Sequence, residues 1–258
     1  MTGKVYLVGA GPGAPDLLTL RAARLLEAAD VVFYDALAHP DTVALARAAT
    51  HVCVGKRHGR ISPSQGAINR ALVRAARRCR TVVRLKGGDP MLFGRAHEEI
   101  QALDRAGIAW EVVPGVTAAL AASAELGISL TRRGVSRSVT FVTPAVGDGE
   151  PRADWPSAVL AADTAAIYMG AGQADRIAAA LLARGLSHDT PVVLMEEASL
   201  PGRNAGWGTL ASLPRLAARW GHAPAIILIG RVLEEALEEA RRDHGRRPAA
   251  AASPLVPV

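Results

Sequence analysis

The stretch Thr81 to Glu99, TVVRLKGGDPMLFGRAHEE, contains the turn on which the fold assignment rests. A short β-branched apolar run changes across GGDP (residues 87–90) to apolar residues at helical spacing, which predicts a strand, a tight turn and a helix. Asp89 suits the N-cap of that helix and Pro90 its first position. Gly87 and Gly88 then lie at the carboxyl end of the strand, where ligands of parallel sheets bind. For this motif alone, a capped turn without a ligand is an equally good interpretation.

A second glycine-rich turn follows a strand near the start of the chain. Residues 5–8 are a short apolar run, and residues 9–13 read GAGPG. With Asp35 further along, this pattern is similar to a dinucleotide site. However, Ala14 replaces the third glycine, and Pro12 lacks the amide hydrogen that a pyrophosphate would bind. The motif therefore favours a ligand without phosphates, although turn formation alone also explains it.

The composition is that of a globular protein. Of 258 residues, 50% are hydrophobic, which is enough for one large domain or two of ordinary size. The two cysteines, Cys53 and Cys79, do not form a metal-like pair, and the histidines have no metal-ligand spacing. We therefore expect no metal, no disulfide and a cytoplasmic protein. No apolar run is long enough to span a membrane, so no membrane partner is expected.

The net charge of +6 comes mostly from arginine. This charge permits an RNA-binding module as one alternative. The arginines are scattered and aromatic residues make up only 4% of the chain. A general bias towards arginine and alanine explains the charge at least as well, so nucleic acid is not the expected partner.

The whole chain alternates strand and helix patterns, which predicts an α/β fold with mostly parallel or mixed sheets. We expect an amino-terminal αβ domain over residues 1–115, a carboxyl-terminal αβ domain over residues 116–243 and a disordered tail over residues 244–258. The predicted strands are 5–8, 31–34, 50–54, 81–85, 110–113, 139–143, 164–168, 191–195 and 225–229. The predicted helices are 17–28, 65–78, 90–106, 116–125, 174–184, 213–220 and 233–242, and residues 144–156 are expected to form a loop.

Two charged residues follow predicted strands and are candidates for chemistry. Asp35 follows the strand 31–34, and Lys56 follows the strand 50–54. In a parallel sheet both reach one crevice, where a carboxylate can accept a proton and an ammonium can pair with an acid. Taken singly, each is better explained as a surface charge. No Ser-His-Asp or Cys-His arrangement is apparent, so hydrolysis loses support.

The series of motifs resembles the tetrapyrrole methylase family over residues 5–232. The stretches that carry the resemblance are, in order, VYLVGAGPGAPDLLTL, ADVVFYDAL, VGKR, VVRLKGGDPMLFGR, VVPGVTAALAA, GISLTRR, IYMG, TPVVLMEEAS, GTL and APAIILIG. The triplet GKR and the motif GGDP followed by FGR are similar to members that methylate uroporphyrinogen III. Members that methylate ribosomal RNA or diphthine differ at that turn.

The resemblance implies two αβ domains with S-adenosyl-L-methionine, the methyl donor, in the cleft between them, and a homodimer. It implies two successive methylations of uroporphyrinogen III, which give precorrin-2 for sirohaem or cobalamin. Asp35 and Lys56 would act on this tetrapyrrole substrate. The cofactor residues that the family motifs imply are Pro12, Gly87, Gly88, Asp89, Leu92, Thr117, Ala118, Met169 and Ala198.

The chain departs from the family pattern mainly on the substrate side. Ala96 and His97 follow FGR where glycines are usual, residues 131–133 read TRR rather than Thr-His-Arg, and residues 143–145 read TPA rather than Thr-Gly-His. A methylase acting later on the corrin ring is therefore the alternative within the family. A nicotinamide-dependent oxidoreductase, suggested by GAGPG and Asp35, is a more distant alternative.

Overall fold

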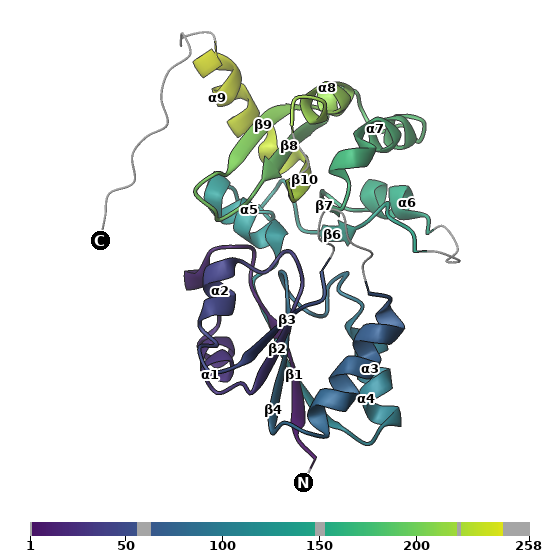
Figure 1. The fold of residues 1–258 in the computed structure, drawn as a ribbon. Helices are drawn as coiled ribbons and strands as arrows, with labels where there is room; N and C mark the ends of the chain where they lie inside the picture. Colours follow the sequence, from purple (N-terminus) through teal and green to yellow (C-terminus); the bar gives the residue numbers. More distant parts are fainter. Residues whose placement is uncertain (1, 56–62, 148–152, 221–222, 245–258) are drawn as a thin grey trace. The chain divides into compact units, whose positions relative to one another are not determined.

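The computed structural model describes residues 2–55, 63–147, 153–220 and 223–244. These residues divide into two compact units, each considered by itself below (Figure 1). The first unit contains the described residues of 1–127, 195–204 and 223–226. The second contains those of 128–194, 205–222 and 227–258. Segments from later in the chain therefore pack with the amino-terminal part.

The first sheet is parallel and has the strand order β3-β2-β4-β1-β5. In its register Gly9 at the end of β1 pairs with Lys86 at the end of β4. The turns GAGPG and GGDP therefore leave neighbouring strands at the same edge of the sheet. The strands are β1 (Lys4–Gly9), β2 (Val31–Tyr34), β3 (Thr50–Cys53), β4 (Thr81–Lys86) and β5 (Ala109–Val113).

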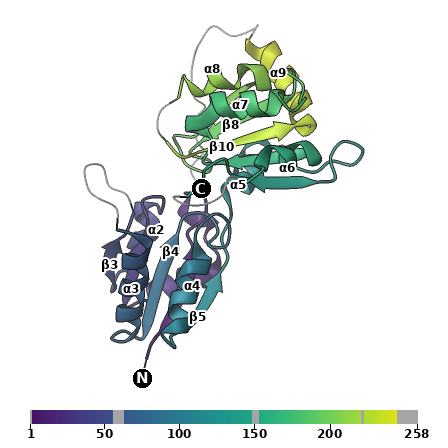
Figure 2. The same ribbon diagram turned by 90° about the vertical axis from the view of Figure 1, so that its right-hand side faces the viewer.

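Helices cover both faces of this sheet. Figure 1 shows α3 (Gln65–Ala76) and α4 (Ala96–Arg105) on one side of the sheet and α1 (Leu20–Glu27) and α2 (Pro40–Ala44) on the other, and Figure 2 gives a second view. Leu7 belongs to the core cluster with α3 and α4, whereas its neighbour Val8 belongs to the cluster with α1 and α2. Successive residues of a strand point to opposite faces, so both must be apolar here. This explains why the strands read as continuous apolar runs. The chain then continues into α5 (Ala118–Leu126).

The second sheet has the strand order β6-β7-β10-β8-β9. Ile167 of β7 and Ile177 of α7 are fully buried in its core, which α6, α7 and α8 cover. The longest helix of the described residues, α3, has 12 residues, and none of the described helices has the length and apolar character needed to cross a bilayer. The elements are β6 (Val139–Val142), α6 (Trp155–Ala161), β7 (Thr164–Tyr168), α7 (Ala174–Leu182), β8 (Pro191–Glu196), β9 (Asn204–Thr209), α8 (Leu213–Ala217), β10 (Ala225–Gly230) and α9 (Glu234–His244), with short 3-10 helices at Pro15–Leu17, Ala171–Gln173, Leu210–Ser212 and Arg231–Leu233.

The predicted α/β class with mostly parallel or mixed sheets is confirmed. Strands 31–34 and 164–168 were predicted with the bounds that the structure gives. Strand β9 was missed because two glycines in NAGWGT lower its β propensity. The predicted loop 144–156 is wrong at its end, where Trp155 already belongs to α6, and α2 was also missed. Residues 245–258 of the predicted tail lie outside the described residues.

An aspartate before a strand has the same role in both sheets. The carboxylate of Asp30, before β2, accepts the N–H groups of Arg80 and Thr81, both at 2.8 Å. Asp163, before β7, accepts the Arg137 N–H at 2.8 Å, and the N–H and hydroxyl of Ser138 at 3.0 and 2.8 Å. Each carboxylate thus ties the start of its strand to the start of the neighbouring one. The backbone bond from Arg137 and the bonds from Ser138 hold the pKa of Asp163 below its usual range.

Asp163→Asn should lower the free energy of unfolding at neutral pH and weaken its dependence on acid. A depressed folded-state pKa gives stability that is complete above the unfolded-state pKa, near 4, and is lost as pH falls through the folded-state value. Urea unfolding at a series of pH values should therefore show a gap between wild type and variant that closes in acid. Asp175→Asn, an exposed residue of α7, is the matched control. A gap for Asp163→Asn that is constant from pH 7 to pH 3 would contradict this role.

Candidate functional site

The two glycine turns of the first unit bind each other through their backbones. The N–H of Gly88 donates to the carbonyl of Gly11 at 2.7 Å, and the N–H of Gly11 donates to the carbonyl of Gly88 at 3.2 Å. The N–H of Ala10 also donates to the carbonyl of Lys86 at 2.7 Å. The turns after β1 and β4 therefore form one rigid structure at the carboxyl edge of the sheet.

A third turn, after β5, packs against the first two at Gly115. A Cβ atom at Gly9 would lie 2.6 Å from the Cα of Gly115 and 2.7 Å from the carbonyl oxygen of Gly88. Only glycine allows this backbone approach. The carboxylate of Asp89 completes the contact, since it accepts the N–H of Gly115 at 2.9 Å. The turns after β1, β4 and β5 thus hold each other in place.

The two glycines of GGDP have different surroundings. A Cβ at Gly87 would lie 2.7 Å from the Cβ of Leu37, so a protein side chain already covers this residue. Gly88 has a left-handed φ of +66°, and the atom nearest to a Cβ added there would be the Cα of Thr117, at 3.9 Å. Thr117 is the N-cap of α5 and is buried, and Ala118 follows it. The space beside Gly88 is therefore open to a ligand on the side of Thr117.

Several positions of the first turn have no N–H group available to a phosphate. The N–H of Gly11 is already bound to Gly88, the N–H of Ala14 donates to Ser199 Oγ at 3.0 Å, and Pro12 has no N–H. Leu200 fills the space beside Gly13. A pyrophosphate cradle needs free amide donors, so this arrangement counts against the dinucleotide interpretation. It is compatible with a ligand that lacks phosphates.

The predicted helix after GGDP begins later than expected. The carboxylate of Asp89 accepts the N–H of Met91 at 2.8 Å and so closes a turn, and α4 begins only at Ala96. Phe93 and Arg95 have φ values of 52° and 56°, which no α-helix accepts. The prediction that Asp89 and Pro90 begin the helix is therefore wrong. The half-buried Leu92 lies within this turn.

Residues with left-handed backbones follow three of the strands. Besides the pair after β4, Met169 follows β7 with φ of 54°, and Glu197 and Ser199 follow β8 with φ of 49° and 76°. Such conformations are costly for residues other than glycine and concentrate at functional sites. The buried Ala198 lies between the last two. Met169 is 53% exposed and belongs to the second unit, whereas the other predicted cofactor residues lie in the first.

Asp35 lies at the carboxyl edge of the sheet, as predicted, and contacts the second glycine turn. Its Oδ2 accepts the N–H of Gly87 at 3.3 Å, and its Oδ1 accepts the N–H of Leu37 at 3.1 Å. The guanidinium of Arg84 is 3.9 Å from Oδ2. The carboxylate is thus oriented by neutral donors and keeps a partly exposed side. Lys56, the other predicted catalytic residue, lies outside the described residues.

A buried ion cluster that sequence reasoning missed lies behind Asp35. Glu99 of α4 is fully buried and accepts Arg84 Nε at 3.0 Å and Lys86 Nζ at 2.9 Å. Gln65 also donates to Glu99 at 3.3 Å, and Arg84 donates to the carbonyl of Leu85 at 2.8 Å. Burial, and then the nearby Arg84, lowers the pKa of Lys86. The guanidinium of Arg84 is therefore bound within the protein.

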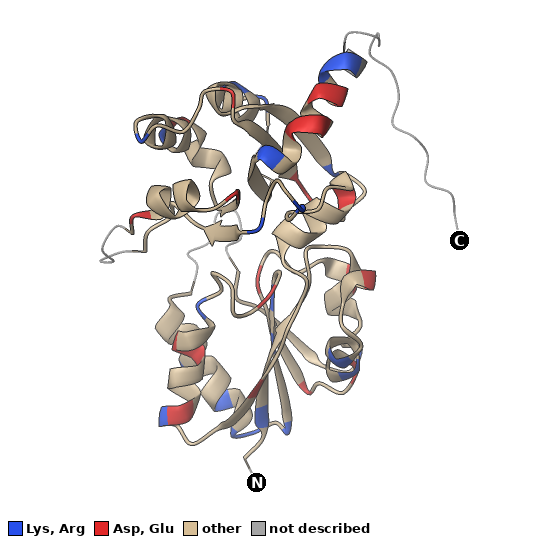
Figure 3. Ribbon diagram, turned by 180° about the vertical axis from the view of Figure 1, so that it is seen from behind, with Lys and Arg blue, Asp and Glu red and all other residues tan. Residues whose placement is uncertain are grey.

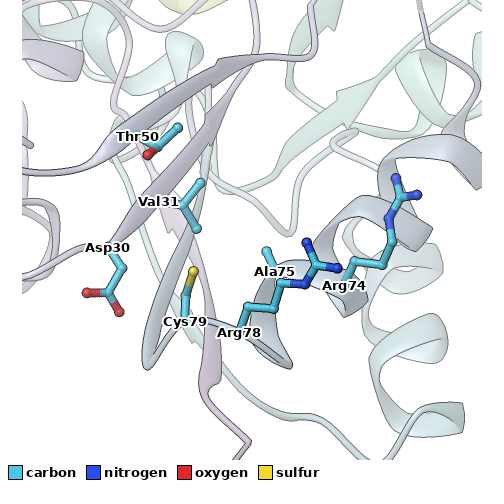
Figure 4. Close-up of a pocket in the computed structure, with 7 residues that line it drawn as sticks. All are labelled: Asp30, Val31, Thr50, Arg74, Ala75, Arg78 and Cys79. Atoms are coloured by element: carbon cyan, nitrogen blue, oxygen red, sulfur yellow. The ribbon is translucent and has the colours of Figure 1, made fainter.

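A pocket on the first unit lies at the opposite end of the first sheet. It has a volume of about 360 Å³, and its lining includes Asp30 and Thr50 beside the amino-terminal ends of β2 and β3 (Figure 4). Ligands of parallel sheets bind at the carboxyl ends, so the glycine turns are the better candidate site. Within the described residues, His, Cys, Asp and Glu side chains form no group of three that could hold a metal ion.

Charged side chains are spread over both units, and α9 carries acidic residues followed by basic ones (Figure 3). Arg132 donates to Glu235 of α9 at 2.5 Å within the second unit. An exposed pair of this kind stabilises a protein only weakly, because solvent screens both charges. It can therefore break without large cost, which would release Arg132 for another acid.

Comparison with known proteins gives one consistent result. The family model of tetrapyrrole (corrin/porphyrin) methylases matches residues 4–214. The chain is 46% identical over 240 residues to a uroporphyrinogen-III C-methyltransferase of Pseudomonas aeruginosa, covering 93% of this chain and 98% of the relative. It is also 46% identical over 234 residues to a siroheme synthase of Pseudomonas entomophila, of which it spans half the length.

Solved structures agree with the sequence relatives. A uroporphyrin-III C-methyltransferase of Thermus thermophilus, solved with S-adenosylhomocysteine, matches with a TM-score of 0.80 and 40% identity over 90% of this chain and 100% of its own. A cobalt precorrin-4 methyltransferase matches with a TM-score of 0.78 and 29% identity over 89% of this chain and 95% of its own. The paired glycine turns, which suit a ligand without phosphates, agree with these matches. The matches establish that the chain belongs to the tetrapyrrole (corrin/porphyrin) methylase family.

Proposed function

We propose that the chain is an S-adenosyl-L-methionine-dependent C-methyltransferase that converts uroporphyrinogen III to precorrin-2 by two successive methylations. The observation that carries the proposal is the 46% identity to a uroporphyrinogen-III C-methyltransferase along 98% of that relative's length. The product would serve sirohaem or cobalamin biosynthesis. A cytoplasmic homodimer is the state that the family resemblance supports, and it belongs to this proposal.

The residues beside the glycine turns fit S-adenosyl-L-methionine, which supplies an electrophilic methyl group. This ligand has no phosphate, in agreement with a first turn in which the N–H groups of Gly11 and Ala14 are already bound and Pro12 has none. Gly88 leaves room for a close approach next to Thr117. The structure solved with S-adenosylhomocysteine in a relative supports the same class of ligand. The proposed cofactor residues are Pro12, Gly87, Gly88, Asp89, Leu92, Thr117, Ala118, Met169 and Ala198.

The chain's own residues have limited chemistry to perform, because an electron-rich pyrrole carbon is itself the nucleophile. Alignment and exclusion of water then supply most of the acceleration. Methylation of this carbon makes the ring system cationic, and a proton must leave. Asp35 is proposed to stabilise this cation or accept the proton with its partly exposed carboxylate. Lys56 is proposed to pair with an acetate or propionate of the substrate.

The reaction itself is the first test. We expect two methyl groups to be added when the protein is incubated with S-adenosyl-L-methionine and freshly generated uroporphyrinogen III, as measured by mass analysis of the product. Reactions without the methyl donor are the control. A product methylated only when a precorrin is supplied would assign the chain to a later corrin-ring step. Binding of NAD without binding of S-adenosylhomocysteine would overturn the proposal.

Gly88→Ala should weaken S-adenosylhomocysteine binding by more than its backbone strain explains. Gly107→Ala is the matched control, because Gly107 has φ of +65° against +66° for Gly88 and no atom within 4 Å of an added Cβ. Both variants should lose about 1 kcal/mol of unfolding free energy, the cost of a left-handed alanine. Calorimetry should show a loss of affinity of roughly tenfold or more for Gly88→Ala alone. Equal affinities in the two variants would make Gly88 a structural turn residue only.

Asp35→Asn should lower turnover without changing the affinity for S-adenosylhomocysteine. The amide keeps the size of the side chain and one acceptor oxygen, but it cannot take the proton or balance a cationic ring. The expected loss in kcat is about 10²- to 10⁴-fold, the range of general acid–base groups. Steady-state kinetics and calorimetry on the same preparation give both quantities, with thermal melting to verify folding. Wild-type turnover by the folded variant would assign Asp35 to the support of the Gly87 turn.

A further inference from the structure

Four charged residues of the first unit form a connected group at the carboxyl ends of β2 and β4. We call Asp35, Arg84, Lys86 and Glu99 the charge cluster. Arg84 and Lys86 are 5% and 3% exposed, and both bind the fully buried carboxylate of Glu99. One carboxylate cannot balance two cations, so Asp35 supplies the second negative charge. Asp35 is also the member that reaches solvent, with 25% of its side chain exposed.

Glu99 determines where the guanidinium of Arg84 lies. Arg84 Nε is bound to Glu99 at 3.0 Å, and its Nη1 donates to the carbonyl oxygens of Leu85 at 2.8 Å and Phe33 at 3.4 Å. The remaining nitrogen, Nη2, is 3.9 Å from Asp35. This is beyond the 2.7–2.9 Å of a charge-assisted hydrogen bond. The guanidinium therefore interacts electrostatically with Asp35 without forming a hydrogen bond to the carboxylate.

We propose that Glu99 is a positioning residue, which holds Arg84 back so that the carboxylate of Asp35 stays available to the substrate. The inference rests on the proposed function, in which Asp35 acts on the tetrapyrrole. Without the charge of Glu99, Arg84 would gain most by moving onto Asp35 and forming a direct bidentate pair. Such a pair would occupy the oxygens that face the substrate. The effect of Glu99 on catalysis thus passes through Arg84.

Stability alone does not account for this cluster. Burying ions is costly, and replacing a buried ion pair by apolar residues of similar volume is often neutral or stabilising. The cluster lies beside the Gly87 turn, where Asp35 accepts a backbone N–H at 3.3 Å, rather than at a distant part of the core. A positioning role explains why four ionisable groups meet at this edge of the sheet.

The first arm of the test is Glu99→Gln, which keeps the shape of the side chain and removes its charge. We expect kcat for uroporphyrinogen III methylation to fall at least tenfold, with the dissociation constant of S-adenosylhomocysteine within about twofold of wild type. Glu111→Gln, which removes a surface carboxylate bound to Lys4 at 2.7 Å, is the matched control and should retain wild-type kcat. A folded Glu99→Gln variant with normal kcat would overturn the inference.

The second arm is the double variant Glu99→Gln with Arg84→Met. It leaves one cation, Lys86, and one carboxylate, Asp35, in the charge cluster and removes the guanidinium that would occupy Asp35. We expect its kcat to exceed that of Glu99→Gln severalfold, because the two changes compensate through Asp35. This variant also decides the matter if Glu99→Gln does not fold. Losses in kcat that simply add for the two changes, or a folded double variant without activity, would show that the charge cluster has a purely structural role.

The same assay separates this inference from the proposed function. Wild-type protein that does not methylate uroporphyrinogen III would overturn the function and the inference with it. Wild-type activity together with normal kcat for Asp35→Asn would leave the function standing and overturn the inference alone. Wild-type activity, a loss for Asp35→Asn and recovery in the double variant would support both.

Discussion

The reciprocal backbone pairing of Gly11 and Gly88 is the constraint on which the rest of the candidate site depends. Two hydrogen bonds of 2.7 and 3.2 Å join turns that leave neighbouring parallel strands. Gly115 can pack against them only because neither it nor Gly9 has a Cβ atom. These contacts occupy the N–H groups of Gly11 and Gly88, which would otherwise be free to bind a phosphate. What remains is an open place beside Gly88, next to the start of α5.

The charged side chains lie behind the paired glycine turns rather than within them. The carboxylates of Asp35 and Asp89 accept N–H groups of turn residues, so both help to shape the turns. Arg84, Lys86 and Glu99 lie deeper. Each of them, like Asp35, has a group of opposite charge at 3.9 Å or less. Low exposure strengthens these interactions but makes an unpaired charge expensive. The orientation of Asp35 is therefore coupled to residues that no ligand touches.

The activity proposed for the chain is consistent with a site built mostly from backbone. Transfer of a methyl group to an already nucleophilic carbon needs alignment of the two reactants, exclusion of water and one well-placed charge more than it needs a nucleophilic side chain. A solved structure similar to this chain is that of a cobalt precorrin-4 methyltransferase. Differences in substrate among family members would then depend on the residues around the paired glycine turns, where this chain has Ala96 and His97 after FGR.

The sequence by itself determined the fold class, most strands and the positions of both glycine turns, because apolar runs and glycine turns are local signals. The series of motifs also determined the family. Only the tertiary structure decided that α4 begins at Ala96 rather than at Pro90, since Asp89 closes a turn and contacts Gly115 instead of capping a helix. Only the tertiary structure revealed Glu99, because a glutamate in the first turn of a helix is an ordinary sequence feature. Its partners come from another element, and contacts between distant parts of a chain leave no pattern in any one stretch of it.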